Sequence, residues 1–308
     1  MNNTMQAVQA QDYGGPEVLA LQQMPRPEPD ADQLLIRLKA AGVNPVDWKI
    51  QSGNFKQLMP LTFPWIPGLE GSGIVEAVGA NVTSFKRGDE VYGIVSGGYA
   101  EYALASVNEI DHKPAGLTME QAAALPLGAL TAWGAVINAA DIQTGQRVLI
   151  HGAAGGVGAY AVQLAKWKGS SVTGTASADN LEFVRSLGAD DVIDYNATRF
   201  ETVLKDFDAV IDTVGGDLPE RSFPVIRPDG IFVTVAAQPT EDAGKAQNIR
   251  TARAGRVSSD HLKQISELVE SNQLKPVVGK VFPLTEAPQA QNLSQTGHGR
   301  GRIILQID

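Results

Sequence analysis

The stretch VLIHGAAGGVGAYAVQLAK (148–166) decides the fold, because it runs from an apolar strand through a glycine-rich turn into a helix. Gly155 lets the backbone come close to a pyrophosphate, and Gly158 lets the helix pack tightly against the strand. The start of such a helix offers free N–H groups and a positive dipole end to phosphates. Ala153 stands where the first glycine of the G-x-G-x-x-G pattern would be. We predict a dinucleotide-binding turn here; the alternative is a tight turn that binds nothing.

Downstream of this turn, short apolar strands alternate with helical stretches. Apolar strands separated by helices are typical of βαβ units, whose parallel sheet is covered on both faces. This rhythm predicts an α/β, doubly wound parallel sheet of the Rossmann type. The expected strands are RVLI (147–150), SVTGT (171–175), DVIDY (191–195), FDAVIDT (207–213) and GIFVTV (230–235).

Upstream, from about residue 5 to residue 115, short strands are interrupted by glycine and proline. This pattern is typical of an antiparallel or barrel-like domain. A stretch rich in small residues follows at 117–140 and predicts one or two helices, with Thr118 and Gln121 as a capping pair. The late strands KVFPL (280–284) and RIILQI (302–307) have no helix of their own, so we expect them to return to the first domain.

The composition excludes several classes of function. The 308 residues carry a net charge of −9 without a basic block, which argues against nucleic-acid and anionic-membrane partners. There is no cysteine, so disulfides and thiolate metal sites are excluded. The first residues lack the pattern of a secretory signal, and no uninterrupted apolar stretch approaches the roughly 18–20 residues that span a bilayer. We therefore expect a cytoplasmic protein.

Serial motifs link the chain to a known family. GQRVLIHGAAGGVGAYAVQLAK (145–166) resembles the signature of the zinc-independent quinone oxidoreductases related to zeta-crystallin, within the medium-chain dehydrogenase/reductase superfamily. The resemblance implies a GroES-like, mostly β catalytic domain formed by both chain ends, 1–118 and 262–308, around a Rossmann domain, 119–261. Further stretches agree with the family: 13–19, 40–53, 66–79, 88–93, 97–103, 124–133 and 210–216.

The resemblance also bears on a metal site. Zinc-containing relatives carry Gly-His-Glu where this chain has Gly68, Leu69 and Glu70, and their first cysteine ligand falls at Asn44. Leucine has no lone pair to offer a metal, so we expect no zinc. Glu70 is interpreted as a structural carboxylate, hydrogen-bonded to backbone or to a nearby cation; direct catalysis is the alternative.

The family implies an enzyme that transfers a hydride from NADPH to a quinone or to the activated C=C of an enal or enone. Such acceptors delocalise the incoming charge, so the protein need only position the partners and offer hydrogen bonds to the developing oxyanion. The alternative is an NADPH-binding protein with a sensing or structural role and little turnover. A zinc alcohol dehydrogenase is disfavoured by Leu69 and Asn44.

Three residues are candidates for the substrate pocket. The resemblance places Asn44 and Thr131 near the nicotinamide, while Lys49 could donate to a substrate oxygen. Each has a plainer interpretation. Asn44 would be a turn-capping residue before a proline, Lys49 a solvated cation, and Thr131 a helix hydroxyl bonded to its own carbonyl.

The predicted cofactor contacts are the glycine turn and the residues that follow the later strands. Parallel sheets bind ligands at the carboxyl ends of their strands. The predicted set is Ala154, Gly155, Gly156, Val157, Gly158, Ser177, Tyr195, Val214, Val235, Ala236 and Ala237.

The end of the second strand predicts NADPH rather than NADH. NAD sites place an acidic residue there, roughly 20 residues beyond the turn, and this chain has Ala176 and Ser177. Asp179 follows and is interpreted as a cap for the helix that begins near Leu181. The sequence leaves the cationic partner of the 2′-phosphate open among Arg185, Arg256, Arg300 and Arg302.

The family's usual homodimer pairs the last Rossmann strand with its copy. In this chain the corresponding region, QNIRTARAGRV (247–257), is polar and contains three arginines. The resemblance therefore implies a homodimer, but this polar stretch calls that homodimer into question.

Overall fold

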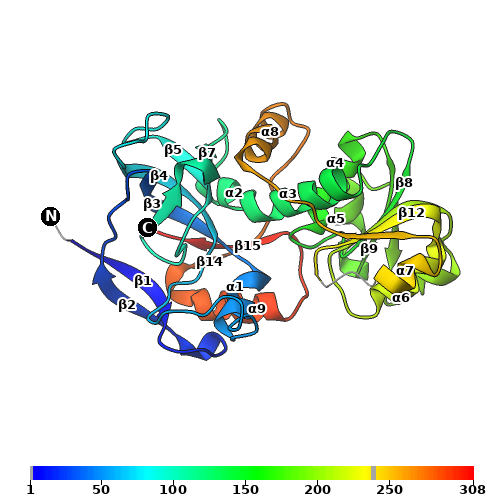
Figure 1. Cartoon of the computed structure of the whole chain (residues 1–308), viewed down its shortest axis with the longest axis horizontal. Coiled ribbons are helices and arrows are strands. Elements are labelled where there is room, and N and C mark those ends of the chain that lie inside the picture. The colour runs from blue at the N-terminus through cyan, green and yellow to red at the C-terminus, as the bar shows by residue number, and fades with distance from the viewer. Residues whose placement is uncertain (1–2, 237–240) are drawn as a thin grey trace.

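The chain forms two lobes joined by a helical run that crosses between them (Figure 1). The computed structural model describes residues 3–236 and 241–308. One lobe contains the strands near both termini, and the other contains the middle of the chain. The helical run consists of α2 (Met119–Ala123), α3 (Pro126–Trp133) and the π-helical η3 (Gly134–Ala139).

Both ends of the chain meet in a mostly antiparallel sheet of seven strands. Strand β15 pairs antiparallel with β3, so the C-terminal strands return to the lobe formed by the N-terminal part, as expected. A separate hairpin joins β1 (Thr4–Ala10) to β2 (Leu19–Pro25). The sheet runs in the order β14 (Val278–Pro283), β15 (Arg302–Gln306), β3 (Gln33–Val43), β4 (Glu70–Val78), β5 (Glu90–Ile94) and β7 (Ile110–His112), with β6 (Tyr102–Ser106) also paired to β3.

The middle of the chain forms a parallel sheet in the order β10–β9–β8–β11–β12–β13. Counted along the chain this order is 3-2-1-4-5-6, the doubly wound arrangement that binds dinucleotides where the order reverses, between β8 and β11. The strands are β8 (Arg147–His151), β9 (Ser171–Ala176), β10 (Asp191–Asp194), β11 (Phe207–Asp212), β12 (Ile226–Thr234) and β13 (Arg250–Arg253).

Helices cover the sheets and connect the lobes. Tyr92 of the β lobe bonds through its hydroxyl to Ser266 of α8 at 2.7 Å, while Leu262 and Ile265 of α8 belong to the same buried cluster as Ile150 of β8, so this helix contacts both lobes. The remaining helices are α1 (Pro45–Gln51), α4 (Gly158–Trp167), α5 (Leu181–Ser186), α6 (Leu218–Ser222), α7 (Glu241–Lys245), α8 (Ser259–Glu270) and α9 (Ala287–Gln295), with short 3₁₀ turns between them. The division at 118/119 and 261/262 stays a prediction.

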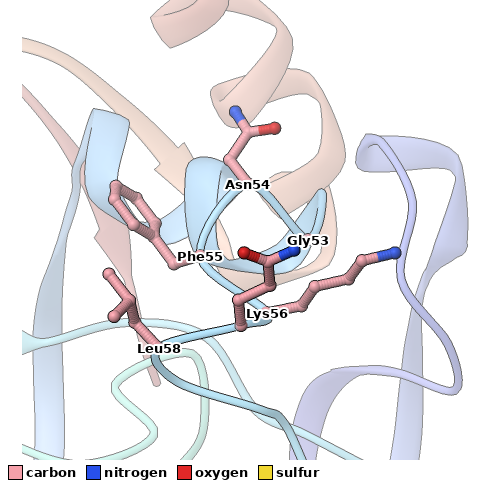
Figure 2. A pocket seen from close by; sticks show the side chains of 6 residues that line it. Gly53, Asn54, Phe55, Lys56 and Leu58 are labelled. Carbon is pink, nitrogen blue, oxygen red and sulfur yellow. The ribbon is translucent and has the colours of Figure 1, made fainter.

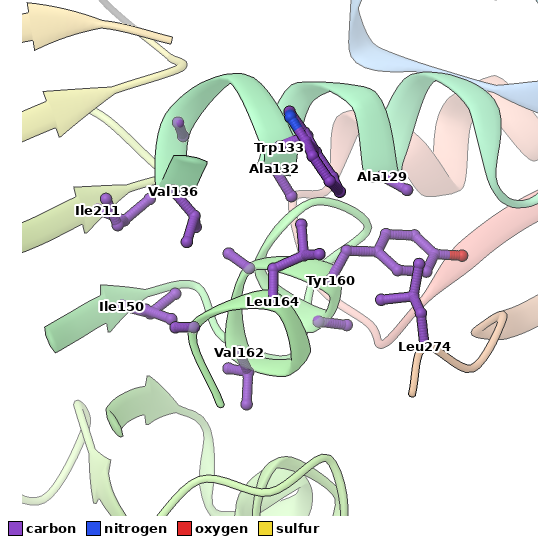
Figure 3. Close-up of a cluster of buried hydrophobic side chains, with 14 of the residues drawn as sticks. Ala129, Ala132, Trp133, Val136, Ile150, Tyr160, Val162, Leu164, Ile211 and Leu274 are labelled. Carbon is purple, nitrogen blue, oxygen red and sulfur yellow. The ribbon is translucent and has the colours of Figure 1, made fainter. Parts of the chain in front are cut away.

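The helical run after Thr118 is a core element. The predicted capping pair is present: the Gln121 N–H donates to the Thr118 hydroxyl at 3.2 Å, and the Thr118 N–H donates to the Gln121 amide oxygen at 3.0 Å. By length and composition the run Met119–Ala139 could cross a membrane, contrary to our expectation of no such stretch, but 72% of its apolar window is buried inside the fold. Figure 3 shows Ala129, Trp133 and Val136 packed over α4.

Candidate functional site

The glycine-rich turn between β8 and α4 has the backbone geometry of a phosphate cradle. Its left-handed residue is Gly152, with a φ of +67°, so the alanine at the first motif position needs no unusual backbone. A Cβ at Gly158 would lie 2.1 Å from the Gly152 carbonyl oxygen, so only glycine lets α4 begin this close to the turn. Within the described chain, the backbone N–H groups of Ala154, Gly156 and Val157 have no hydrogen-bond partner. These groups are free to bind an anion.

Behind the turn, His151 is a structural residue. Its ring nitrogens lie 3.2 Å from Thr175 Oγ1 and 3.0 Å from Ser222 Oγ. Burial, together with the nearby Arg221 cation, lowers the pKa of His151 to about 3. The imidazole is therefore neutral at pH 7 and holds neighbouring strands and helices together.

The residues predicted to contact the cofactor gather at the carboxyl edge of the parallel sheet. Ser177 follows β9 and Tyr195 follows β10, and the two chain segments are joined because the Tyr195 N–H donates to the Ala176 oxygen at 3.2 Å. Val214 follows β11 and lies against the turn, since a Cβ at Gly152 would come within 2.8 Å of its Cγ2. The structure thus brings these predicted residues to the same edge as the glycine turn.

The end of β12 completes this edge. The Val235 N–H donates to the Asp212 carbonyl at 3.0 Å, and the Ala236 N–H donates to the Thr234 hydroxyl at 3.2 Å. Val235 and Ala236 therefore follow β12 beside the end of β11, as expected. Ala237 lies outside the described residues.

The Ser177 hydroxyl is free to donate a hydrogen bond. Its oxygen accepts a hydrogen bond from the Asn180 side-chain amide at 2.9 Å, which leaves its own O–H free to donate. The prediction that Asp179 caps the next helix is wrong. A single 3₁₀ turn, Ala178–Asn180, intervenes, and Asn180 occupies the cap position before α5.

Two of the four candidate arginines lie next to α5, the helix that follows Ser177. Arg185 pairs with Glu182 at 2.5 Å on the helix itself. Arg300 comes from the C-terminal segment and places its guanidinium 5.3 Å from the centre of the Phe183 ring. Arg256 is exposed after β13, at the other edge of the sheet. Arg300 is the candidate that approaches the Ser177 side of the sheet without a carboxylate partner among the described residues.

The helix that carries Thr131 touches the glycine turn directly. A Cβ at Gly128 of α3 would lie 2.6 Å from the Gly156 carbonyl oxygen, so the helix and the turn are in backbone contact. Thr131 is half-buried, and its hydroxyl has no hydrogen bond within the described chain. The plainer interpretation, a hydroxyl bonded to its own helix, is therefore wrong. The Thr131 hydroxyl is free to bind another group.

Asn44 sits at the start of α1, and its side chain is engaged across the fold. Its Nδ2 donates to Glu70 Oε1 at 2.8 Å, and its Oδ1 accepts from Arg302 Nη2 at 2.6 Å. The side chain is buried, with 4% of the residue exposed. These contacts use the amide oxygen and one N–H and leave the second N–H for another acceptor.

Glu70 is the structural carboxylate that the sequence suggested, and a cation lies beside it. The residue is fully buried; Oε1 accepts from Asn44 and from Arg302, and Oε2 accepts from the Leu127 N–H at 2.7 Å. With both oxygens committed and Leu69 lacking a donor atom, this donor set does not fit a zinc ion. Among the described residues, no cluster of three or more His, Cys, Asp or Glu side chains could hold a metal ion.

Arg302 connects this cluster to the glycine turn, a role that the sequence did not indicate. It is only 4% exposed, and a Cβ at Gly156 would lie 3.0 Å from its Nη1. The preceding Gly301 N–H donates to the Ala154 carbonyl at 2.8 Å. Arg302 therefore lies at the glycine turn. Its Nε is buried and has no partner within the described chain, so the guanidinium has donors to spare.

A second buried acid, Asp47, accepts a hydrogen bond from the backbone of Asn44. Asp47 Oδ2 accepts the Asn44 backbone N–H at 2.8 Å and the Tyr99 hydroxyl at 3.1 Å. Burial, assisted by the Glu70 charge, raises the pKa of Asp47 to about 7. Burial also raises the pKa of Tyr99 well above its ordinary value. The backbone of Asn44 is thus fixed separately from its side chain.

Lys49 is not gathered into this cluster. It lies on α1, half-buried, with its ammonium 5.5 Å from the centre of the Trp48 ring. The loop after α1 forms a hollow of about 300 Å³ lined by 53–58, which contains none of the predicted site residues. Figure 2 shows Lys56 extending to one side of this hollow, with Phe55 and Leu58 on the other. The role of Lys49 stays a prediction.

Known proteins match the chain over its whole length. The family model for the alcohol dehydrogenase GroES-like domain matches residues 30–115, and the zinc-binding dehydrogenase model matches residues 187–305. A chloroplastic quinone-oxidoreductase homolog of Spinacia oleracea is 35% identical, with 98% of each chain covered. The structure of the quinone oxidoreductase from Coxiella burnetii is 35% identical with a TM-score of 0.90, covering 99% of this chain and all of the other. This chain belongs to the quinone oxidoreductase family.

Family membership confirms the resemblance and the fold. The chain is a medium-chain dehydrogenase/reductase with a GroES-like domain and a Rossmann-type parallel sheet. It is an oxidoreductase of this family, and a nicotinamide cofactor is supported by two further relatives. One is a mitochondrial NAD(P)H oxidoreductase of Danio rerio, 33% identical over 90% of this chain and 84% of its own length. The other is a mycobacterial protein solved with NADPH, 27% identical with a TM-score of 0.90, covering 98% of this chain and 99% of the other.

The same relatives correct the predicted location. The relatives from Spinacia oleracea and Danio rerio are chloroplastic and mitochondrial, so the prediction of a cytoplasmic protein is wrong. The prediction rested on the lack of a secretory signal, and that pattern does not distinguish the cytoplasm from these organelles.

Proposed function

We propose that the chain is an NADPH-dependent reductase that passes a hydride to a quinone or to an activated C=C, without zinc. The observation that carries this proposal is the contact of Arg302 with both the glycine turn and the Asn44 amide, since it joins a cofactor cradle to a hydrogen-bond donor. NADPH, when bound, supplies the hydride. The chain's own residues then bind the phosphates, orient the acceptor and stabilise the charge on its oxygen.

The proposed role of each residue follows from the hydrogen-bond donors that it has free. The N–H groups of Ala154, Gly156 and Val157, with the spare donors of Arg302, would bind the pyrophosphate. The second N–H of Asn44 would donate to the oxyanion that develops on the acceptor. An alcohol is the poorer substrate, because the buried cation at this position is an arginine already bonded to Glu70 and cannot coordinate an alkoxide as zinc does.

The test of this function is NADPH oxidation with a panel of quinones, enals and enones, with and without a chelator. We expect turnover with at least one class of acceptor, and the same rate after treatment with EDTA. Metal analysis of the purified protein should find no stoichiometric zinc. NADPH binding without turnover would favour the sensing or structural role, and activity lost with the metal would contradict the zinc-free mechanism.

We also propose a preference for NADPH over NADH, with Ser177 and Arg300 as the 2′-phosphate partners. Ser177 has a free hydroxyl proton, and Arg300 reaches the neighbouring helix. Replacing Ser177 with aspartate should raise kcat/KM for NADH relative to NADPH by tenfold or more, because a carboxylate repels the 2′-phosphate and binds the ribose hydroxyls. Steady-state kinetics with both cofactors measure the ratio, and Ser186→Asp, at the last residue of α5, is the control. A wild-type protein that prefers NADH would contradict the proposal.

We propose that any homodimer formed through β13 is weak. The outer edge of the described parallel sheet is β13, and its first and last residues, Arg250 and Arg253, are exposed. Antiparallel pairing of this strand with its copy about Thr251 and Ala252 would place these arginines opposite each other. Like charges directly opposite in a sheet are destabilising.

A further inference from the structure

Glu70 bonds to three elements that each lead to a different part of the proposed site. Oε1 accepts from Asn44 at the start of α1 and from Arg302 of β15, and Oε2 accepts from the Leu127 N–H in the first turn of α3. These partners are 26, 232 and 57 residues away along the chain. A single carboxylate thus fixes three segments that the sequence keeps far apart.

The fold reserves space for this carboxylate. A Cβ at Gly42 of β3 would lie 2.0 Å from Glu70 Oε1 and 2.5 Å from Cδ, so a side chain at Gly42 would displace the carboxyl group. Glu70 itself is fully buried. An anion in this position is stable only because Arg302 neutralises it and N–H groups satisfy its oxygens.

Two partners of Glu70 lead to the glycine turn, and the third, Asn44, is the proposed hydrogen-bond donor to the acceptor. Arg302 lies against Gly156, and the α3 helix held at Leu127 contacts the same glycine through Gly128. On the other side, the Asn44 amide is oriented by Glu70 and Arg302 together. A phosphate bound at the turn would therefore draw on the same guanidinium that orients Asn44.

We propose that Glu70 is a positioning residue that couples the cofactor turn to the Asn44 amide through Arg302. This inference rests on the proposed function, because it assigns the order in which that site is assembled. A bound pyrophosphate attracts the guanidinium and loosens its bond to Asn44, while Glu70 keeps hold of both groups. With the phosphates in place, Glu70 alone then sets the direction of the free Nδ2 proton of Asn44.

The test follows the Asn44 side-chain amide by NMR in protein labelled with [¹⁵N]asparagine, with the signal assigned from an Asn44→Ala sample. Adding NADPH to the wild type should shift the Asn44 signals. In Glu70→Gln the shift should fall to less than half, although NADPH still binds with a Kd within about threefold of wild type, because the spare donors of Arg302 remain. An equal shift in both proteins would overturn the proposal. This readout does not depend on turnover, so it is separable from a failure of the proposed reaction.

Kinetics and two further variants complete the design. Glu70→Gln should lower kcat by about tenfold and leave KM for NADPH nearly unchanged, a split that a purely structural role would not produce. Glu76→Gln, on the same strand and paired with surface arginines, is the matched control and should leave both values unchanged. If Glu70→Gln fails to fold, Glu70→Asp keeps the charge opposite Arg302 but is one methylene too short to hold all three partners. It should show the same reduced shift, and a wild-type response in this variant would likewise overturn the proposal.

Discussion

Replacing Asn44 with alanine is expected to lower turnover with a quinone or enone by about a hundredfold, the cost of removing one oxyanion-type donor. The Asn44 amide has its oxygen and one N–H committed to Arg302 and Glu70, which leaves one N–H for the acceptor. NADPH binding should change much less, because the pyrophosphate is bound by the glycine turn and Arg302. Pre-steady-state reduction of the acceptor and a direct NADPH titration separate these two effects.

The fold should survive this change. Glu70 and Arg302 bond to each other directly, so neither buried charge is left without a partner when Asn44 is removed. Asn81→Ala is a suitable control, because it also deletes an asparagine amide bonded to a carboxylate, here the exposed Asp32. Unchanged turnover in Asn44→Ala, with the melting temperature preserved, would reduce Asn44 to a structural residue.

Replacing Arg302 with methionine is expected to destabilise the protein by about 3–5 kcal/mol, because it leaves Glu70 as a buried carboxylate without a counter-charge. Calorimetry should show this loss as a fall in Tm of roughly 10 °C. The protection that NADPH gives against heat should also fall, because the spare donors beside the glycine turn are gone.

Arg87→Met is the matched control for this experiment. Arg87 pairs with Glu76, a glutamate on the same strand as Glu70, but its side chain is 76% exposed, so its loss should cost less than about 1 kcal/mol. Equal effects of the two substitutions would show that the buried pair contributes no more than a surface pair.

The parts of the molecule that the sequence determined are those encoded by local patterns. The glycine turn is recognisable because a strand, a turn and a helix must follow one another within a few residues. The parallel sheet is recognisable because apolar strands alternate with helices, and the expected strands 171–175 and 207–213 correspond to β9 and β11. Family membership also followed from the sequence, since the motifs lie in order along nearly the whole chain.

Local patterns were misleading where the outcome depends on neighbours. Asp179 resembles a helix cap by its position before an amphipathic stretch, yet one extra 3₁₀ turn gives that place to Asn180. We expected no stretch long and apolar enough to span a bilayer, yet Met119–Ala139 meets that length and composition and is mostly buried inside the fold. Periodicity and composition alone do not report what covers a helix.

Only the tertiary structure decided which residues of the site contact one another. Arg302 lies where a segment of glycine and charge, TGHGRGRI (296–303), meets the expected last strand, and the local sequence offered that segment only a solvated loop or, alternatively, a phosphate contact. In the fold it is buried against Glu70, 232 residues away, and Asn44, 258 residues away. A charge is buried only where a distant partner neutralises it and hydrogen bonds satisfy it, and no local pattern specifies that partner. The sequence therefore determined which cofactor turn is present and which metal ligands are missing, whereas the return of the C-terminal strand to β3 decided that an arginine lies beside Glu70 and Asn44 at the glycine turn.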